Sequence, residues 1–101
     1  AKLQDALGVH AAGGKVYVTD SYNHKIKLLD PKTRELKTLF GDGKRGSQDQ
    51  KGWAEKTARF NEPSGLWAVD DKLFVADQNN HAIRVCDLKS GEVRTIPVEK
   101  R

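Results

Sequence analysis

The strongest constraint on this sequence is an internal repeat that aligns without a gap. A shift of 57 positions places residues 7–39 on residues 64–96, and Asp-Ser-Tyr-Asn-His at 20–24 falls on Asp-Gln-Asn-Asn-His at 77–81. The identical pairs span the whole unit: Gly8/Gly65, Ala11/Ala68, Lys15/Lys72, Val18/Val75, Ile26/Ile83, Asp30/Asp87, Glu35/Glu92 and Thr38/Thr95. The chain is therefore two copies of one unit. Because a single repeat unit usually cannot bury its apolar faces alone, we expect the two copies to stack against each other.

Each copy predicts four short strands joined by turns. The strands are expected at 7–12, 16–19, 24–28 and 36–39, and again at 65–69, 73–76, 81–85 and 93–96. Gly-Gly and Asp-Asp pairs form the first turns, and apolar residues alternate with a period of two in the third strands. No segment has the apolar spacing of an amphipathic helix, so we expect an all-β fold with helix content near zero.

A long segment separates the two copies. Residues 40–59 contain four glycines and many charges, which predicts a loop. Loops longer than about 12–15 residues are uncommon unless they are functional or ordered by their own contacts. We expect Trp53, Ala54 and Ala58 to anchor it, and we divide the chain into a first unit at 3–39, a loop at 40–59, a second unit at 60–96 and a tail at 97–101.

A repeated four-strand meander is typical of a β-propeller, which has about four to eight such blades. The sequences at 20–27 and 77–84 resemble the signature of the NHL repeat, and Ala-Arg-Phe-Asn-Glu-Pro-Ser-Gly at 58–65 resembles the segment that leads into an NHL inner strand. With Gly-Asp-Gly at 41–43, the chain is most similar to the propeller of thioredoxin-like proteins that carry NHL repeats. The first unit departs from the pattern, with Gln-Asp-Ala-Leu at 4–7 in place of Asn-Glu-Pro-Ser.

The resemblance implies a six-bladed ring, because NHL propellers commonly have six blades. Two blades bury one interface between them and leave two apolar faces exposed to water. Each Å² of apolar surface that stays exposed loses about 25 cal/mol of stabilising free energy. Three chains in head-to-tail contact would hide both faces. We therefore expect two NHL-type antiparallel blades that complete a six-bladed propeller as a homotrimer.

One polar cluster recurs in both blades and is expected to be structural. The aspartates should accept hydrogen bonds from backbone N–H groups of the following turn, the asparagines should bridge that turn, and the histidines should bond to a neighbouring blade. A catalytic role is less favoured, because the two aspartates lie on different blades without an evident acid or base partner. The cluster comprises Asp20, Asn23, His24, Asp77, Asn80 and His81.

We expect no catalytic residue, cofactor or bound metal. Some NHL lyases hold a metal on channel histidines, so the resemblance leaves His10 as a minor candidate, although Trp67 stands at the matching position. The single Cys86 aligns with Leu29, which predicts a buried apolar side chain and favours a reducing compartment such as the cytoplasm; the compartment otherwise stays open.

The net charge of +4 is a mild bias in a chain with 18 Lys and Arg and 14 Asp and Glu. Some NHL propellers bind RNA on a basic surface, and the candidate rim here is Lys25, Lys27, Lys44, Arg45, Arg59 and Arg84, with Lys51 and Lys56 nearby. A solvated mixed surface is the favoured interpretation.

These observations favour a non-catalytic scaffold for self-assembly or protein interaction, cut from a larger protein or engineered as a blade pair. The alternatives are an RNA-binding surface, the propeller part of a multidomain thioredoxin-like protein and, less favoured, an NHL-type lyase. Further copies of the chain are the expected partners, a protein or RNA less so. A membrane partner is not expected, because no apolar run approaches about 20 residues.

Overall fold

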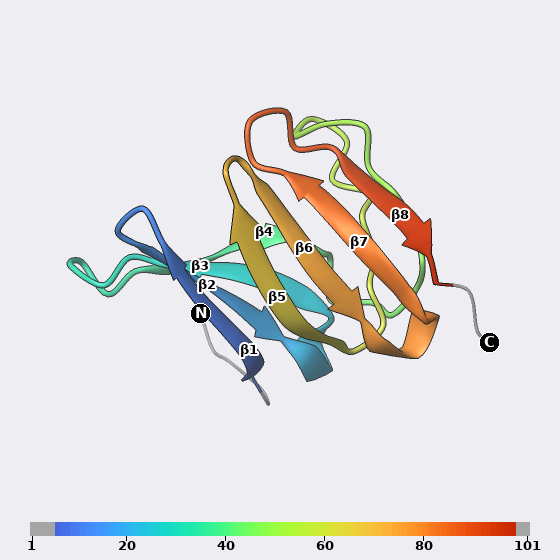
Figure 1. Cartoon of the computed structure of the whole chain (residues 1–101), viewed down its shortest axis with the longest axis horizontal. Helices are drawn as coiled ribbons and strands as arrows, with labels where there is room; N and C mark the ends of the chain where they lie inside the picture. Colours follow the sequence, from blue (N-terminus) through green and yellow to red (C-terminus); the bar gives the residue numbers. More distant parts are fainter. Residues whose placement is uncertain (1–5, 99–101) are drawn as a thin grey trace.

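The computed structural model describes residues 6–98, which form two four-stranded antiparallel sheets (Figure 1). The first sheet contains β1 (Ala6–Ala12), β2 (Lys15–Asp20), β3 (Lys25–Leu29) and β4 (Leu36–Phe40). The second contains β5 (Pro63–Val69), β6 (Lys72–Asp77), β7 (Ala82–Asp87) and β8 (Val93–Pro97). Both sheets follow the chain order, so the expected pair of all-β meanders is confirmed. Residues 3–5 and 99–101 of the expected divisions lie outside the described residues.

Several expected strand limits were wrong. β5 begins at Pro63 and not at 65, and β8 includes Pro97, which was expected in the tail. Phe40 belongs to β4 and not to the loop, because a register shift between Ile26 and Lys27 lets it pair with Ile26. His24 and His81 precede the third strands, each directly after a single 3-10 turn, η1 (Ser21–Asn23) or η2 (Gln78–Asn80). Both histidines have a left-handed backbone conformation, with φ of 55° and 52°, and this conformation ends the turn before the strand starts.

No helix within residues 6–98 is long and apolar enough to cross a membrane.

The hydrophobic core lies between the two sheets. Tyr17, Ile26 and Phe40 contribute from the first sheet, and Leu73, Val75, Cys86 and Val93 from the second. β5 lies close to β1 and β2, while Ala58 and Phe60 of the connecting segment complete the core. Burying a large apolar side chain contributes about 1.5–3 kcal/mol, so this shared core fixes the two sheets against each other.

The long connection is ordered by contacts with both sheets. Gln50 exchanges two backbone hydrogen bonds with Val93 of β8, of 3.1 and 2.8 Å. The ring of Trp53 stacks on Phe40 at 4.9 Å, and its indole N–H donates to the Lys89 carbonyl at 3.1 Å. Trp53 and the buried Ala58 therefore anchor the loop as expected, whereas the expectation for Ala54 was wrong, because its side chain is exposed.

Candidate functional site

The segment that leads into β5 docks on the first sheet through its backbone. Three side chains, at the end of β2, in η1 and directly after η1, hold three successive residues of this segment. Thr19 donates to the Ser64 carbonyl, Ser21 donates to the Pro63 carbonyl, and the Glu62 N–H donates to His24 Nδ1 at 2.9 Å. Since all three groups held are backbone groups, the docking depends on chain geometry more than on side-chain identity.

A glycine makes this close approach possible. Gly8 of β1 donates its N–H to Thr19 Oγ1 at 2.7 Å, and a Cβ on Gly8 would lie only 2.3 Å from the Ser64 carbonyl oxygen. Any larger residue would therefore push the two chain segments apart. Gly8, Thr19, Ser21 and His24 together are called the first docking site below.

Asp77 connects the second sheet to the same incoming segment. It forms a fully buried ion pair with Arg84 at 2.9 Å, and it accepts hydrogen bonds from the Asn61 N–H at 2.8 Å and the Asn80 side chain at 2.7 Å. The expectation that Asp77 binds backbone N–H groups of the following turn was wrong; the backbone group it binds comes from the segment before β5. This arrangement is structural, because it fixes the start of the second blade.

Arg84 also holds the connecting loop. Its guanidinium donates to the carbonyls of Arg59 and Gln48, both at 2.6 Å, and it lies 4.8 Å from the centre of the Phe60 ring. A long, planar cation with several donors can satisfy these separate acceptors at once. Sequence reasoning missed this role, although an arginine in a strand that otherwise alternates toward the core was the available signal.

The first sheet has a polar cluster at the corresponding positions. Asp20 pairs with Lys27 at 2.8 Å, both buried, and accepts from the Asn23 side chain at 2.8 Å. Lys27 and Arg84 are therefore inside the molecule, and the expectation that they belong to an exposed rim was wrong. Of the other candidates, Lys44 and Arg45 are exposed, Lys25 is half-buried, and Arg59 pairs with Asp42 at 2.9 Å. The six cations do not share one surface.

The two histidines differ in their surroundings. His24 is buried and bonds to the second blade, as the sequence suggests, while His81 is exposed. His10 on β1 lies 4.9 Å from Trp67 on β5, with their rings inclined by 42°. Within residues 6–98, no three His, Cys, Asp or Glu side chains are grouped in a way that could hold a metal ion.

Cys86 is fully buried, and burial raises the pKa of its thiol to about 12. At neutral pH the side chain is therefore a thiol and not the thiolate that nucleophilic chemistry requires. It fills the core beside Leu73, its partner across the β6–β7 pair.

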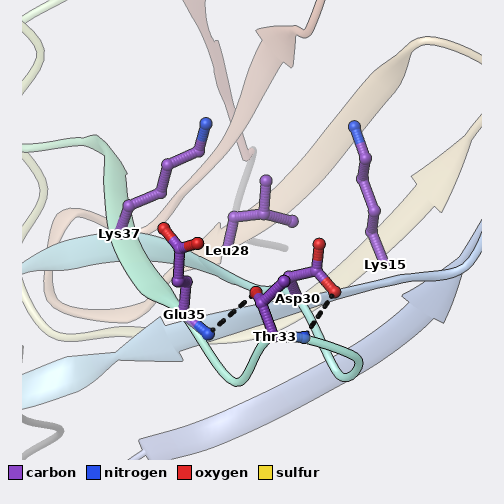
Figure 2. Close-up of a pocket in the computed structure, with 6 residues that line it drawn as sticks. All are labelled: Lys15, Leu28, Asp30, Thr33, Glu35 and Lys37. Atoms are coloured by element: carbon purple, nitrogen blue, oxygen red, sulfur yellow. Dashed lines mark hydrogen bonds between the residues drawn. The ribbon is translucent and has the colours of Figure 1, made fainter.

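A surface hollow beside the turn between β3 and β4 offers little for chemistry. Figure 2 shows Leu28 among the side chains of Lys15, Lys37 and Glu35. Asp30 and Thr33 accept backbone hydrogen bonds, both of 3.3 Å, which shape the turn itself (Figure 2). The polar groups there serve the turn, so we do not assign a ligand to this hollow.

Comparison with known proteins supports the interpretation as NHL-type blades. No family model matches the chain. It is 52% identical over 92 residues to Protein SUPPRESSOR OF QUENCHING 1, chloroplastic, of Arabidopsis thaliana, and 45% identical over 102 aligned positions to human NHL repeat-containing protein 2. These alignments cover 89% and 97% of this chain but only 8% and 14% of those proteins, so the chain corresponds to a small part of either relative.

The fold has a counterpart among solved structures. An auxiliary nutrient binding protein from Bacteroides thetaiotaomicron superposes with a TM-score of 0.64 over 89% of this chain and 24% of its own. At 24% sequence identity, this similarity concerns the fold alone.

Proposed function

Because this chain is a pair of β-propeller blades homologous to part of NHL repeat-containing protein 2, we propose that it is a non-catalytic scaffold whose outer faces pack against further blades. For the chain by itself, the further blades are those of two other copies, which complete a six-bladed ring. The proposal rests on a correspondence between the two sheet faces that form the core and the two sheet faces that point away from it.

The face of the second sheet that points away from the first repeats the face that forms the core. The 57-residue shift takes the core residues Tyr17 and Ile26 to Phe74 and Ile83. Phe74 lies between Leu73 and Val75, both of which face the core, so strand alternation places it on the opposite face. The second sheet thus presents outward the kind of surface that the first sheet presents inward.

The reverse relation holds for the outer face of the first sheet. The shift takes the core residues Leu73, Val75 and Cys86 back to Val16, Val18 and Leu29. The two outer faces therefore match one another as the two inner faces do. A head-to-tail contact with a second copy would repeat the interface inside the chain, and repeated rotation can close such contacts into a ring.

Large apolar side chains on these sheets are left in contact with water. Val9 is 65% exposed, Trp67 62% and Ile96 47%. Covering such side chains contributes about 1.5–3 kcal/mol each, which favours association. In a longer polypeptide that carries more blades, the same two faces would meet the preceding and following blades.

A scaffold role also agrees with the state of the repeated polar groups. Asp77 forms an ion pair with Arg84 and accepts a hydrogen bond from the segment before β5, and His24 accepts one from the Glu62 N–H. These side chains therefore position the blades and are not free for acid–base chemistry. The RNA-binding alternative has less support, because Lys27 and Arg84 are buried.

Sedimentation velocity and light scattering test the assembly. We expect a species of three times 11.2 kDa at micromolar concentration. Ile96→Lys, which places a charge on an exposed apolar position of β8, should shift the protein to monomer. Ser47→Lys, at an exposed loop position, is the matched control and should leave the trimer intact. A wild-type chain that stays monomeric would contradict the ring.

A further inference from the structure

The second sheet contains a counterpart of the first docking site, and none of the chain segments within residues 6–98 is docked on it as residues 62–64 are on the first. The 57-residue shift takes Gly8, Thr19, Ser21 and His24 to Gly65, Ala76, Gln78 and His81. A Cβ on Gly8 would collide with the Ser64 backbone, whereas one on Gly65 would have no atom outside its immediate chain neighbours within 4 Å. The space that the incoming segment fills on the first sheet is open on the second.

The backbone around His81 repeats that around His24. Each histidine ends a 3-10 turn in the left-handed region, and each donates its N–H back to the first residue of that turn, at 3.1 Å for His24 and 3.2 Å for His81. The imidazole of His81 is therefore attached in the same way as the imidazole that accepts the Glu62 N–H. It borders a hollow of about 200 Å³ lined by Ala76, Asp77, Gln78, His81, Ala82 and Val98.

We propose that this hollow, called the open docking site, binds the segment that leads into the first strand of another NHL-type blade. The inference rests on the proposed scaffold function and names its specific contact. His81 Nδ1 accepts a backbone N–H, as His24 does from Glu62, and the Gln78 amide donates to the next carbonyl in the place of Ser21. Gly65 allows the close approach.

The open docking site differs from the first in two of the side chains that contact the incoming backbone, because Gln78 stands in the place of Ser21 and Ala76 in the place of Thr19. Ala76 has no hydroxyl where Thr19 donates to the Ser64 carbonyl, so binding relies on Gln78 and His81. Because the groups recognised are backbone groups, both Asn-Glu-Pro-Ser at 61–64 and the corresponding segment at 4–7 of a second copy have the required N–H and carbonyl. The ligand is thus a blade-entering segment, defined by its backbone.

A peptide titration tests this site separately from the ring. The probe is a synthetic peptide with the sequence of residues 59–65, Arg-Phe-Asn-Glu-Pro-Ser-Gly, added to the ¹⁵N-labelled chain below the concentration at which it associates. We expect amide shifts at Gly65, Gln78 and His81 but not at His24. Gly65→Val should raise the peptide Kd more than about tenfold, since a side chain there blocks the approach.

Two variants of His81 test whether its imidazole acts as a hydrogen-bond acceptor for the peptide or only supports the fold. His81→Ala removes the acceptor and should weaken binding about fivefold. His81→Asn should restore binding to within about twofold, because asparagine tolerates the left-handed conformation and places Oδ1 where histidine has Nδ1.

Absence of shifts at millimolar peptide, or equal affinity in Gly65→Val, would overturn the open docking site. Peptide binding without a trimer would reject the ring and keep the site. A trimer that forms equally well in Gly65→Val would reject the site and keep the ring.

Discussion

The ring of Trp53 in the connecting loop lies 4.9 Å from the ring of Phe40 at the end of β4, with the two planes inclined by 17°. The same indole donates to the Lys89 carbonyl in the turn between β7 and β8. One side chain therefore joins the outer strand of the first blade to the outer turn of the second. The angle between the blades depends on this contact as well as on the core.

Trp53→Ala should lower the free energy of unfolding by about 2 kcal/mol, since it removes an aromatic stack and a hydrogen bond. Urea denaturation followed by circular dichroism measures the change. Trp67→Ala is the matched control: with 62% of its surface exposed, Trp67 should contribute less than about 1 kcal/mol to the isolated chain. Equal losses in the two variants would contradict the role given to Trp53.

Asp77→Ala should destabilise the chain by about 3–5 kcal/mol, because it leaves the buried Arg84 without its anionic partner. Lys89→Met, which removes an exposed ion pair with Asp71, should cost less than about 1 kcal/mol. Both values come from denaturant titrations of the purified variants. A small effect at Asp77 would show that the ion pair does not hold the blade entrance.

Gly8→Ala and Gly65→Ala test one position of the repeat in its filled and open states. Gly8→Ala should cost about 1–3 kcal/mol, because its Cβ would overlap the Ser64 carbonyl. Gly65→Ala adds a methyl group to open space and should leave stability unchanged or slightly raised. Thermal unfolding of both variants at low protein concentration compares them; a reversed order would contradict the docking geometry.

The carboxylate of Asp87 should stabilise the folded chain at neutral pH but not in acid. The backbone N–H groups of Ser90 and Lys89 hold the pKa of its carboxyl below the ordinary value of 3.8. A folded-state pKa below the unfolded value stabilises the fold above pH 3.8, and this contribution is lost as the pH falls through the folded-state pKa. Asp87→Asn should therefore be less stable than wild type at about pH 6, and the difference should shrink as the pH falls below 3.8. A difference that persists in acid would point to another cause.

Cys86 should be unreactive while the chain is folded, because burial keeps its pKa at about 12. Incubation with 5,5′-dithiobis-(2-nitrobenzoic acid) at about pH 8 should label less than about a tenth of the chains, and unfolding in guanidinium should expose the full thiol. Rapid labelling of the native protein would show that β7 opens locally.

The sequence predicts the strands well because repetition and alternation are both local signals. It could not predict the limits at His24 and His81, since a left-handed residue before a strand depends on backbone geometry that the period-two pattern does not encode. It identified the polar cluster of Asp77, Asn80 and His81 but not the distant partners of that cluster. Asn61 and Gly46 reach it only because the loop returns to the blade.

The loop contact at Gln50 also bears on how this protein avoids aggregation. β8 is the edge strand of the second sheet, and such edges expose backbone groups that can recruit strands from other chains. Gln50 occupies both the N–H and the carbonyl of Val93 on that edge, so an incoming strand cannot bond there without first displacing the loop. Strand addition at Val93 is therefore hindered, and the blade contacts proposed above use the faces of the sheets and not this edge.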